Sequence, residues 1–449
     1  MKLFGTDGIR TRAGQFPLNS AAVKAIGQAI GEAMDGVVLM GEDTRTSSPW
    51  IRELLRAGLS KTRTAVHDAG VIPTPAIALL TKSGNYSGGI MISASHNSFE
   101  DNGVKVFGPD GAKLSDEAEA GIERRILELL PAGATEQQDR VPNAAVSAAN
   151  TTGFTEQYIQ LLMSRFPSGG WMQGMRVVVD CANGALSEVA PAALRVLGAE
   201  LHVLNAQPSG TNINAGCGAV HLDALVDAMN NRSADFGVAF DGDGDRSMFV
   251  SGSGARVDGD AVLLIMARRF RRIGRLDPPV IVGTSMTNFA LEQMFRAEGI
   301  SLTRVAVGDR FVFEEMQRSG SVLGGEPAGH IIFSDFNISG DGLLTTLKVA
   351  ETLAAERATL DELTRDWFPA PHLLKGIRVR QKVPLETLPA VQSKITEVEQ
   401  ALRGCGRIVV RYSGTEPLLR VMIESDNASR NERLMEALLA SIREHIEIA

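Results

Sequence analysis

Three aspartates in one short loop, Asp241, Asp243 and Asp245, are the strongest chemical signal in the sequence. They alternate with glycines, so their carboxylates can turn inward around one cation, and oxygen ligands favour Mg²⁺ or Ca²⁺. An EF-hand loop starts similarly, but it needs glycine and glutamate where this chain has Arg246 and Gly252. The loop predicts a metal site of another kind, beside which Arg246 can neutralise a phosphate. A solvated acidic turn is the alternative.

A serine and a histidine, Ser95 and His96, stand side by side in a second polar loop. The serine can act as a nucleophile or carry a phosphoryl group. The loop lacks the glycines of the GxSxG motif, and a plain turn is an equal alternative because Ser, His and Asn are common turn residues. Lys105 follows and can place a cation near a phosphoserine, although a lone surface lysine is the alternative.

A third loop, residues 324–330, combines glycine and proline with one carboxylate and one imidazole. Glu326 can accept hydrogen bonds from hydroxyl groups, and His330 can transfer a proton. A purely structural turn is an equal alternative for this loop in isolation.

A fourth loop, near the C-terminus, places small hydroxyl residues around a glycine between two apolar strands. Backbone N–H groups, hydroxyl groups and flanking arginines together predict a phosphate site, with a hairpin turn as the alternative. The sequence contains neither GxxxxGK[ST] nor GxGxxG, so nucleotide binding of those types is unsupported. The candidate residues are Arg411, Ser413, Gly414, Thr415 and Arg420.

The elements that must position these loops follow a repeated plan. A β-branched strand, a polar turn, a helix that stops at a glycine and a second strand recur from Val37, Val177 and Val280 onward. This plan predicts three related α/β domains with mixed sheets, followed by a smaller C-terminal α+β domain. The three helices should stop at Gly58, Gly198 and Gly299. The expected domains are residues 1–150, 151–252, 253–368 and 369–449.

Length, charge and cysteine content exclude several classes of protein. The 449 residues carry a formal net charge of −8, which argues against a nucleic-acid partner. The basic run Arg268–Arg272 follows an apolar stretch and is typical of a helix C-terminus. Three scattered cysteines fit a reducing compartment. Apolar runs stay well short of the roughly 18 residues of a membrane span, so we expect a cytoplasmic protein without a membrane partner.

Together the four loops resemble the α-D-phosphohexomutase superfamily over essentially the whole chain. The resemblance rests on motifs in the family's order: Ser93–Asn97, Asp241–Arg246, Glu326–His330 and Arg411–Pro417. Other segments resemble the branch that interconverts glucosamine 6-phosphate and glucosamine 1-phosphate, toward UDP-N-acetylglucosamine and the cell wall. A branch acting on glucose or mannose phosphates is the alternative. The segments are Phe4–Arg10, Asn212–Gly218, Val307–Arg310 and Leu323–Glu326.

The resemblance implies four domains around a central cleft and a phosphorylated Ser95. Its phosphoryl group would pass to the sugar phosphate, and the resulting bisphosphate, which is also the activator, would turn around and return its other phosphate. A homodimer is compatible with this resemblance. One Mg²⁺ would be held by Ser95, Asp241, Asp243 and Asp245. The transferring phosphate would be surrounded by Arg10, His96, Lys105, Arg246 and His330. Glu326 would bind sugar hydroxyls, and the non-reacting phosphate would be held by Arg411, Ser413, Gly414, Thr415 and Arg420.

Overall fold

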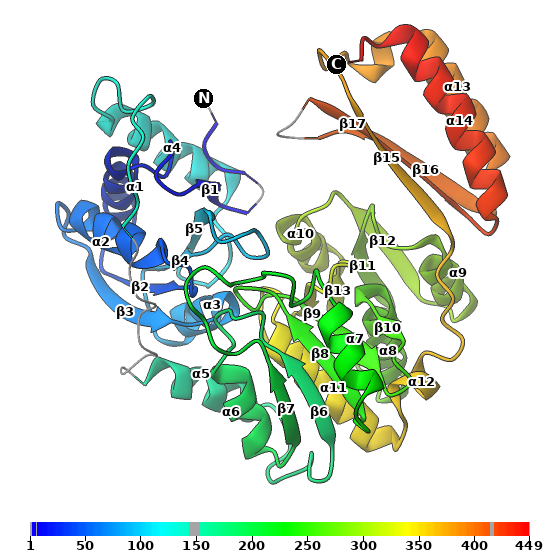
Figure 1. The fold of residues 1–449 in the computed structure, drawn as a ribbon, viewed down its shortest axis with the longest axis horizontal. Coiled ribbons are helices and arrows are strands. Elements are labelled where there is room, and N and C mark those ends of the chain that lie inside the picture. Colours follow the sequence, from blue (N-terminus) through cyan, green and yellow to red (C-terminus); the bar gives the residue numbers. More distant parts are fainter. Residues whose placement is uncertain (1, 6, 143–152, 414–416, 449) are drawn as a thin grey trace. The chain divides into compact units, whose positions relative to one another are not determined.

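The computed structural model describes residues 2–5, 7–142, 153–413 and 417–448. The chain divides into two compact units, Met1–Thr284 with Val305–Arg365 and Ser285–Arg304 with Asp366–Ala449. Three α/β domains lie in sequence order along the first unit, and a smaller α+β domain forms most of the second (Figure 1). The predicted fold class is confirmed.

The first domain is built on a mixed sheet. Its strand order is β1 (Ile9–Arg12), β5 (Asp101–Phe107), β4 (Gly88–Ile92), β2 (Val37–Glu42) and β3 (Ala65–Val71). The first three strands pair antiparallel, whereas β4, β2 and β3 pair parallel. The helices are α1 (Ser20–Ala33), α2 (Ser48–Leu59), α3 (Thr74–Ser83) and α4 (Asp116–Leu129). Every residue of β4 is buried, as its uninterrupted apolar sequence requires.

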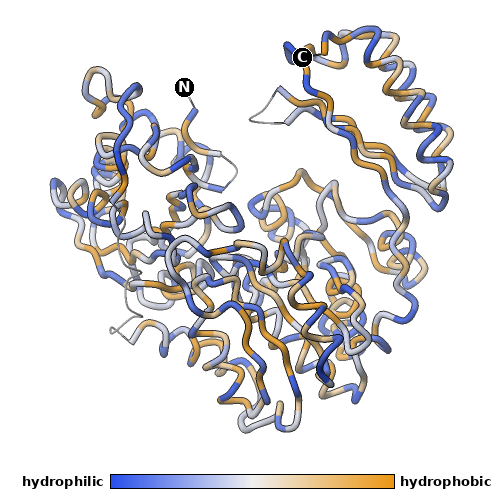
Figure 2. The backbone as a smooth tube through the Cα atoms, in the orientation of Figure 1, coloured by the Kyte–Doolittle hydropathy of each residue, from blue (hydrophilic) through white to orange (hydrophobic). Residues whose placement is uncertain are grey.

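The second domain repeats this arrangement strand for strand. Its order is β10 (Arg256–Val257), β9 (Ser247–Ser251), β8 (Phe236–Phe240), β6 (Arg176–Asp180) and β7 (Glu200–Leu204). Antiparallel pairing again gives way to parallel pairing at the central strand, here β8. The helices are α5 (Phe154–Met163), α6 (Val189–Val196) and α7 (Asp223–Asn230). In Figure 2, β6 and β8 are mainly the orange of hydrophobic residues, as expected for strands covered on both faces.

The sheet of the third domain has the same pairing around its central strand, parallel on one side and antiparallel on the other. Its strand β13 (Leu323–Gly325) pairs parallel with β11 (Val280–Thr284) and antiparallel with β14 (Ile331–Phe333). Its helices in the first unit are α8 (Gly259–Arg272), α10 (Asp309–Ser319), α11 (Gly342–Glu356) and α12 (Leu360–Leu363). The strands β4, β8 and β13 therefore hold equivalent places in three sheets, and the loops that follow them are equivalent loops.

The second unit contains a three-stranded antiparallel sheet. Its order is β15 (His372–Arg378), β17 (Leu418–Ser425) and β16 (Gly406–Tyr412). The helices α13 (Pro389–Ala401) and α14 (Ala428–His445) pack on it, with a short 3₁₀ turn, η1 (Leu385–Thr387). The segment Ser285–Arg304 adds α9 (Phe289–Ala297) and most of β12 (Ser301–Val305).

The predicted helix ends are partly confirmed. Gly198 and Gly299 follow α6 and α9 in the left-handed conformation, with φ of +91° and +69°. The prediction for Gly58 is wrong, because this glycine lies inside α2. A Cβ there would lie 2.1 Å from the carbonyl oxygen of Lys24, on the neighbouring helix α1. The glycine permits close packing of two helices instead of ending one of them.

This packing predicts that Gly58→Ala destabilises the protein by about 1–3 kcal/mol, because the added methyl group overlaps backbone atoms. Urea unfolding of the full chain measures the change. Gly121→Ala in α4 is the matched control, since a Cβ there meets no atom within 4 Å. That control is expected to stabilise the helix by up to ~1 kcal/mol. Equal effects of the two substitutions would contradict the packing argument.

Further expectations concern the basic run, membrane-spanning helices, the linker and the domain boundaries. The basic run Arg268–Arg272 ends α8, as predicted. None of the described helices combines the length and the apolar character needed to cross a bilayer. The linker predicted at residues 130–150 begins directly after α4, and its part from residue 143 onward lies outside the described residues. The boundaries of the four domains stay predictions.

Candidate active site

Three of the four predicted loops meet in the first unit. The serine loop joins β4 to β5, the aspartate loop joins β8 to β9, and the loop with Glu326 and His330 joins β13 to β14. Each therefore follows the equivalent strand of its domain, at the carboxyl end where α/β sheets usually bind ligands.

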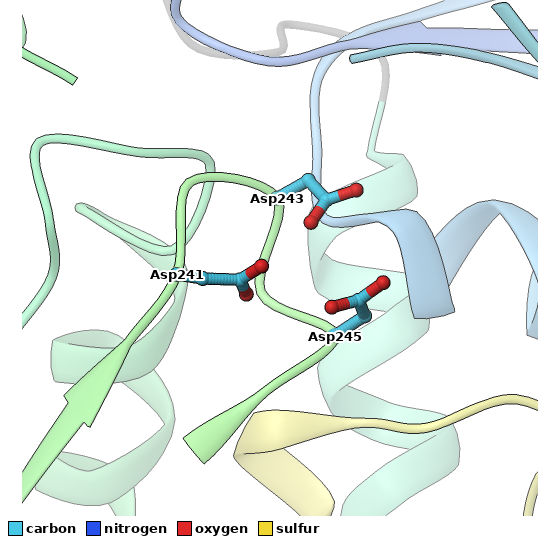
Figure 3. A group of neighbouring side chains, drawn as sticks. All are labelled: Asp241, Asp243 and Asp245. Atoms are coloured by element: carbon cyan, nitrogen blue, oxygen red, sulfur yellow. The ribbon is translucent and has the colours of Figure 1, made fainter. Parts of the chain in front are cut away.

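The side chains of Asp241, Asp243 and Asp245 point toward one another (Figure 3), and a ligand oxygen from each lies within 4.8 Å of the others. All three are buried. Burial, followed by the charges of Asp245 and Asp243, raises the pKa of Asp241 well above its usual range. Within the described part of the chain, one buried oxygen of Asp243 and one of Asp245 accept no hydrogen bond. A hard divalent cation would satisfy these oxygens and offset the repulsion, so the residues fit such a metal.

Ser95 lies directly beside the aspartates. Its hydroxyl donates a hydrogen bond to Oδ2 of Asp241 at 2.7 Å and lies 3.3 Å from Nδ1 of His96. Its φ of +53° is in the left-handed region, which is uncommon for residues other than glycine and often marks functional sites. Burial, followed by the charges of Arg246 and Arg10, lowers the pKa of His96 to about 4. The imidazole beside Ser95 is therefore neutral near pH 7.

Lys105 projects from β5 into the same site and is 1% exposed, which excludes a surface lysine. Its Nζ lies 2.8 Å from Oδ2 of Asp243, 3.3 Å from Oδ2 of Asp245 and 3.1 Å from Oδ2 of Asp7. The lysine thus neutralises part of the negative charge of the aspartate loop, to which Ser95 also donates through Asp241.

Two arginines contribute hydrogen-bond donors to the site. Arg10 donates from Nη1 to the carbonyl oxygen of Ala94 at 3.4 Å, and the backbone N–H of Arg246 donates to Oδ1 of Asp241 at 3.1 Å. The buried Nε atoms of both arginines donate to no described residue. Donors that make no hydrogen bond, beside carboxylate oxygens that accept none, suit a ligand that brings an anion together with a cation.

The loop with Glu326 and His330 packs against the aspartate loop. Oε1 of Glu326 accepts a hydrogen bond from the backbone N–H of Gly308 at 3.0 Å, which orients the carboxylate. Nε2 of His330 accepts from the N–H of Gly340 at 3.0 Å, which assigns the ring proton to Nδ1. Nδ1 lies 3.8 Å from Oδ1 of Asp245. A loop from the third domain thereby completes the environment of the aspartates.

Sequence reasoning missed a second set of charged residues in this site. Lys113 forms ion pairs with Asp7 and with Asp309, at 2.6 Å in the latter case. Burial opposes the charge of Asp309, but Lys113 and then His330 lower its pKa to about 2. Asp7 and Asp309 lie within segments that resemble the family, yet no local sequence pattern predicts that both pair with Lys113. A row of alternating charges results, formed by Asp245, Lys105, Asp7, Lys113 and Asp309, and His330 lies 3.8 Å from the aspartates at both ends of this row.

The predicted phosphate loop belongs to the second unit. Arg411 and Arg420 are direct partners on β16 and β17, and both line one small cavity of about 30 Å³. Two guanidinium groups on one cavity can donate together to a bound anion. Ser413 is buried at the end of β16, and its carbonyl oxygen accepts from Nζ of Lys382 at 2.6 Å. Gly414 and Thr415 lie outside the described residues.

Comparison with protein families places all four domains. Family models for phosphoglucomutase/phosphomannomutase match as alpha/beta/alpha domain I at residues 1–131, domain II at 156–254 and domain III at 258–370. The model of the C-terminal domain matches residues 374–441. Of the solved structures, a phosphoglucomutase/phosphomannomutase family protein from Burkholderia thailandensis is similar over 98% of this chain and 97% of its own. Its TM-score is 0.78 at 22% identity, which shows the fold.

Curated relatives are similar over nearly their full length. Phosphoglucosamine mutase of Solibacter usitatus is 45% identical and covers 98% of both chains. Phosphoglucosamine mutase of Koribacter versatilis is 42% identical over 100% of this chain and 98% of its own. The chain therefore belongs to the phosphoglucomutase/phosphomannomutase family and, within it, to the phosphoglucosamine mutases.

Proposed function

We propose that this protein interconverts glucosamine 6-phosphate and glucosamine 1-phosphate through a phosphorylated Ser95. The observation that carries the proposal is the buried Ser95 hydroxyl, 2.7 Å from Asp241, in a site with unsatisfied carboxylate oxygens and unsatisfied guanidinium N–H groups. Phosphoryl transfer needs little more than positioning and charge neutralisation, and these groups supply both. The curated relatives support glucosamine as the sugar.

In the first half-reaction, the bond between phosphorus and Oγ of Ser95 breaks while the C1 hydroxyl oxygen of glucosamine 6-phosphate bonds to phosphorus. The products are glucosamine 1,6-bisphosphate and an unmodified serine. The proton of the sugar hydroxyl ends on Oγ, where Asp241 accepts it in a hydrogen bond. The neutral imidazole of His96 lies 3.3 Å from Oγ and can pass this proton on.

In the second half-reaction the bisphosphate, turned around, returns its 6-phosphate to Ser95. A bond between phosphorus and Oγ forms, the bond to O6 breaks, and the serine proton ends on O6, which releases glucosamine 1-phosphate. Added bisphosphate keeps Ser95 phosphorylated and so acts as an activator. A site enclosed by several loops protects this intermediate from water.

The remaining residues act by binding. The three aspartates and Ser95 with its phosphate would hold Mg²⁺, which would supply charge neutralisation at the transferring group. Arg10, Lys105, Arg246 and His330 surround that phosphate, and Glu326 binds sugar hydroxyls. The non-reacting phosphate is held by Arg411, Ser413, Gly414, Thr415 and Arg420. We keep the cytoplasmic location and the homodimer as predictions.

A coupled assay tests the proposal with purified full-length protein, Mg²⁺ and a trace of sugar 1,6-bisphosphate. We expect the highest kcat/KM with glucosamine phosphate and lower values with glucose and mannose phosphates. A higher value with glucose or mannose phosphate would replace the proposed substrate with the alternative. Release of inorganic phosphate in place of isomerised sugar phosphate would show a phosphatase.

A further inference from the structure

We propose that Arg45 and Asn214 are positioning residues that fix the backbone of Ser95 for phosphoryl transfer. Neither side chain carries a role in the mechanism above, and each donates hydrogen bonds to the carbonyl oxygen of Ser95. The inference rests on the proposed function, since it assigns the two residues to the same reaction.

Arg45 lies in the loop after β2 with a side chain that is 0% exposed. Its Nη2 donates to the carbonyl oxygens of Ser95 and Asn97, both at 2.9 Å. Its Nη1 donates to the carbonyl oxygens of Ser98 and Asp101, the latter at 3.1 Å. A buried guanidinium group whose two Nη atoms donate to the carbonyl groups of one loop holds the shape of that loop.

Asn214 approaches the same loop from the second domain. Its Nδ2 donates to the carbonyl oxygens of Ser95 at 2.9 Å and Asn97 at 3.1 Å. Its own backbone is left-handed, with φ of +56°, and its N–H donates to the carbonyl oxygen of Ala182 at 2.9 Å. The carbonyl of Ser95 is thus held by one donor from its own domain and one from the neighbouring domain.

The aspartate loop adjoins this clamp of Arg45 and Asn214. A Cβ on Gly242 would lie 2.7 Å from the carbonyl oxygen of Ser95 and 2.7 Å from Nδ2 of Asn214. The glycine between the metal-ligand candidates therefore allows the clamp to reach the serine backbone. With its carbonyl fixed, Ser95 stays at its unfavourable φ, and Oγ stays directed at Asp241.

Arg45 and Asn214 donate to backbone carbonyl oxygens and are not among the residues proposed to bind the sugar or its phosphates, so loss of the clamp should lower kcat and leave KM nearly unchanged. Asn214→Gly tests this without backbone strain, because glycine accepts the left-handed conformation. Asn205→Gly is the matched control, since Asn205 has φ of +49° in the same domain and its side chain bonds Asp180 instead of the serine loop. Arg45→Lys is a second variant, which keeps the charge but cannot serve four carbonyl groups.

We expect Asn214→Gly to reduce kcat by about 10- to 100-fold, the scale of an ångström-level misplacement, with KM within about twofold of wild type. Single-turnover transfer from phosphorylated enzyme to sugar phosphate should slow equally, while thermal unfolding should match that of Asn205→Gly. Unchanged kcat, or an equal loss in both asparagine variants, would overturn the clamp. Absence of mutase activity in the wild type would instead overturn the proposed function.

Discussion

Ser95→Ala is expected to abolish mutase turnover, with a loss in kcat of roughly 10⁴-fold or more, the scale seen when a catalytic nucleophile is removed. Oγ of Ser95 is the atom that gives and takes the phosphoryl group in the proposed reaction, and it is the hydroxyl held against Asp241. Sugar-phosphate binding should stay largely intact, because the groups proposed to grip the substrate are elsewhere.

Mass spectrometry and calorimetry complete this test. Wild-type protein incubated with sugar bisphosphate should gain the mass of one phosphate group, whereas Ser95→Ala should gain none and still bind glucosamine 6-phosphate. Ser98→Ala, at an exposed position three residues along the same loop, is the control and should behave as wild type. Full mutase activity in Ser95→Ala would contradict the mechanism.

Removal of the divalent cation is expected to have the second large effect. Chelation should reduce activity by at least about 100-fold, and added Mg²⁺ should restore it, because buried carboxylates and a phosphoryl group need charge neutralisation. Asp243→Asn should lower activity to a similar degree, because it removes a charge that pairs with Lys105 and would face the proposed metal.

Thermal unfolding gives a readout that does not depend on activity. Saturating Mg²⁺ should stabilise the wild-type fold by about 2.7 kcal/mol at 100 times its Kd, since the metal binds the folded state. Asp243→Asn should lose most of this stabilisation. Asp223→Asn, which changes an exposed carboxylate of the same domain, should retain it. Equal Mg²⁺ stabilisation of both variants would show that the aspartate loop is not the metal site.

Local sequence patterns are sufficient to predict the chemistry of single loops. Asp241, Asp243 and Asp245 are close in space because they are close in sequence, and the glycines between them leave few other arrangements. The flanking apolar runs became β8 and β9, which place the loop at a sheet edge. The serine loop is predictable in the same way. Only the hydrogen bond from Ser95 to Asp241, however, excludes the alternative of a plain turn.

Other residues have roles that depend on packing, and for these the sequence pattern predicts the wrong role or leaves the role open. Gly58 has the spacing of a helix stop, but its role is set by α1, which lies against it. For Lys105 the sequence leaves a lone surface lysine as the alternative, which is excluded because β5 pairs antiparallel with β4 and the buried side chain contacts Asp243. No motif predicts the partners of Arg45, Lys113 and Asn214.

The three α/β repeats and the polar residues of each loop are predictable from the sequence, because they follow from short-range spacing and from hydrophobic periodicity. Which of these loops lie together is visible only in the folded chain. Arg45 bonds the carbonyl of Ser95 across 50 residues, and Asn214 bonds it across 119. Contacts at such separations depend on sheet order and domain packing, which spacing along the chain does not encode. The loops after β4, β8 and β13 hold equivalent places in three separate sheets, and the packing of the domains brings them into contact.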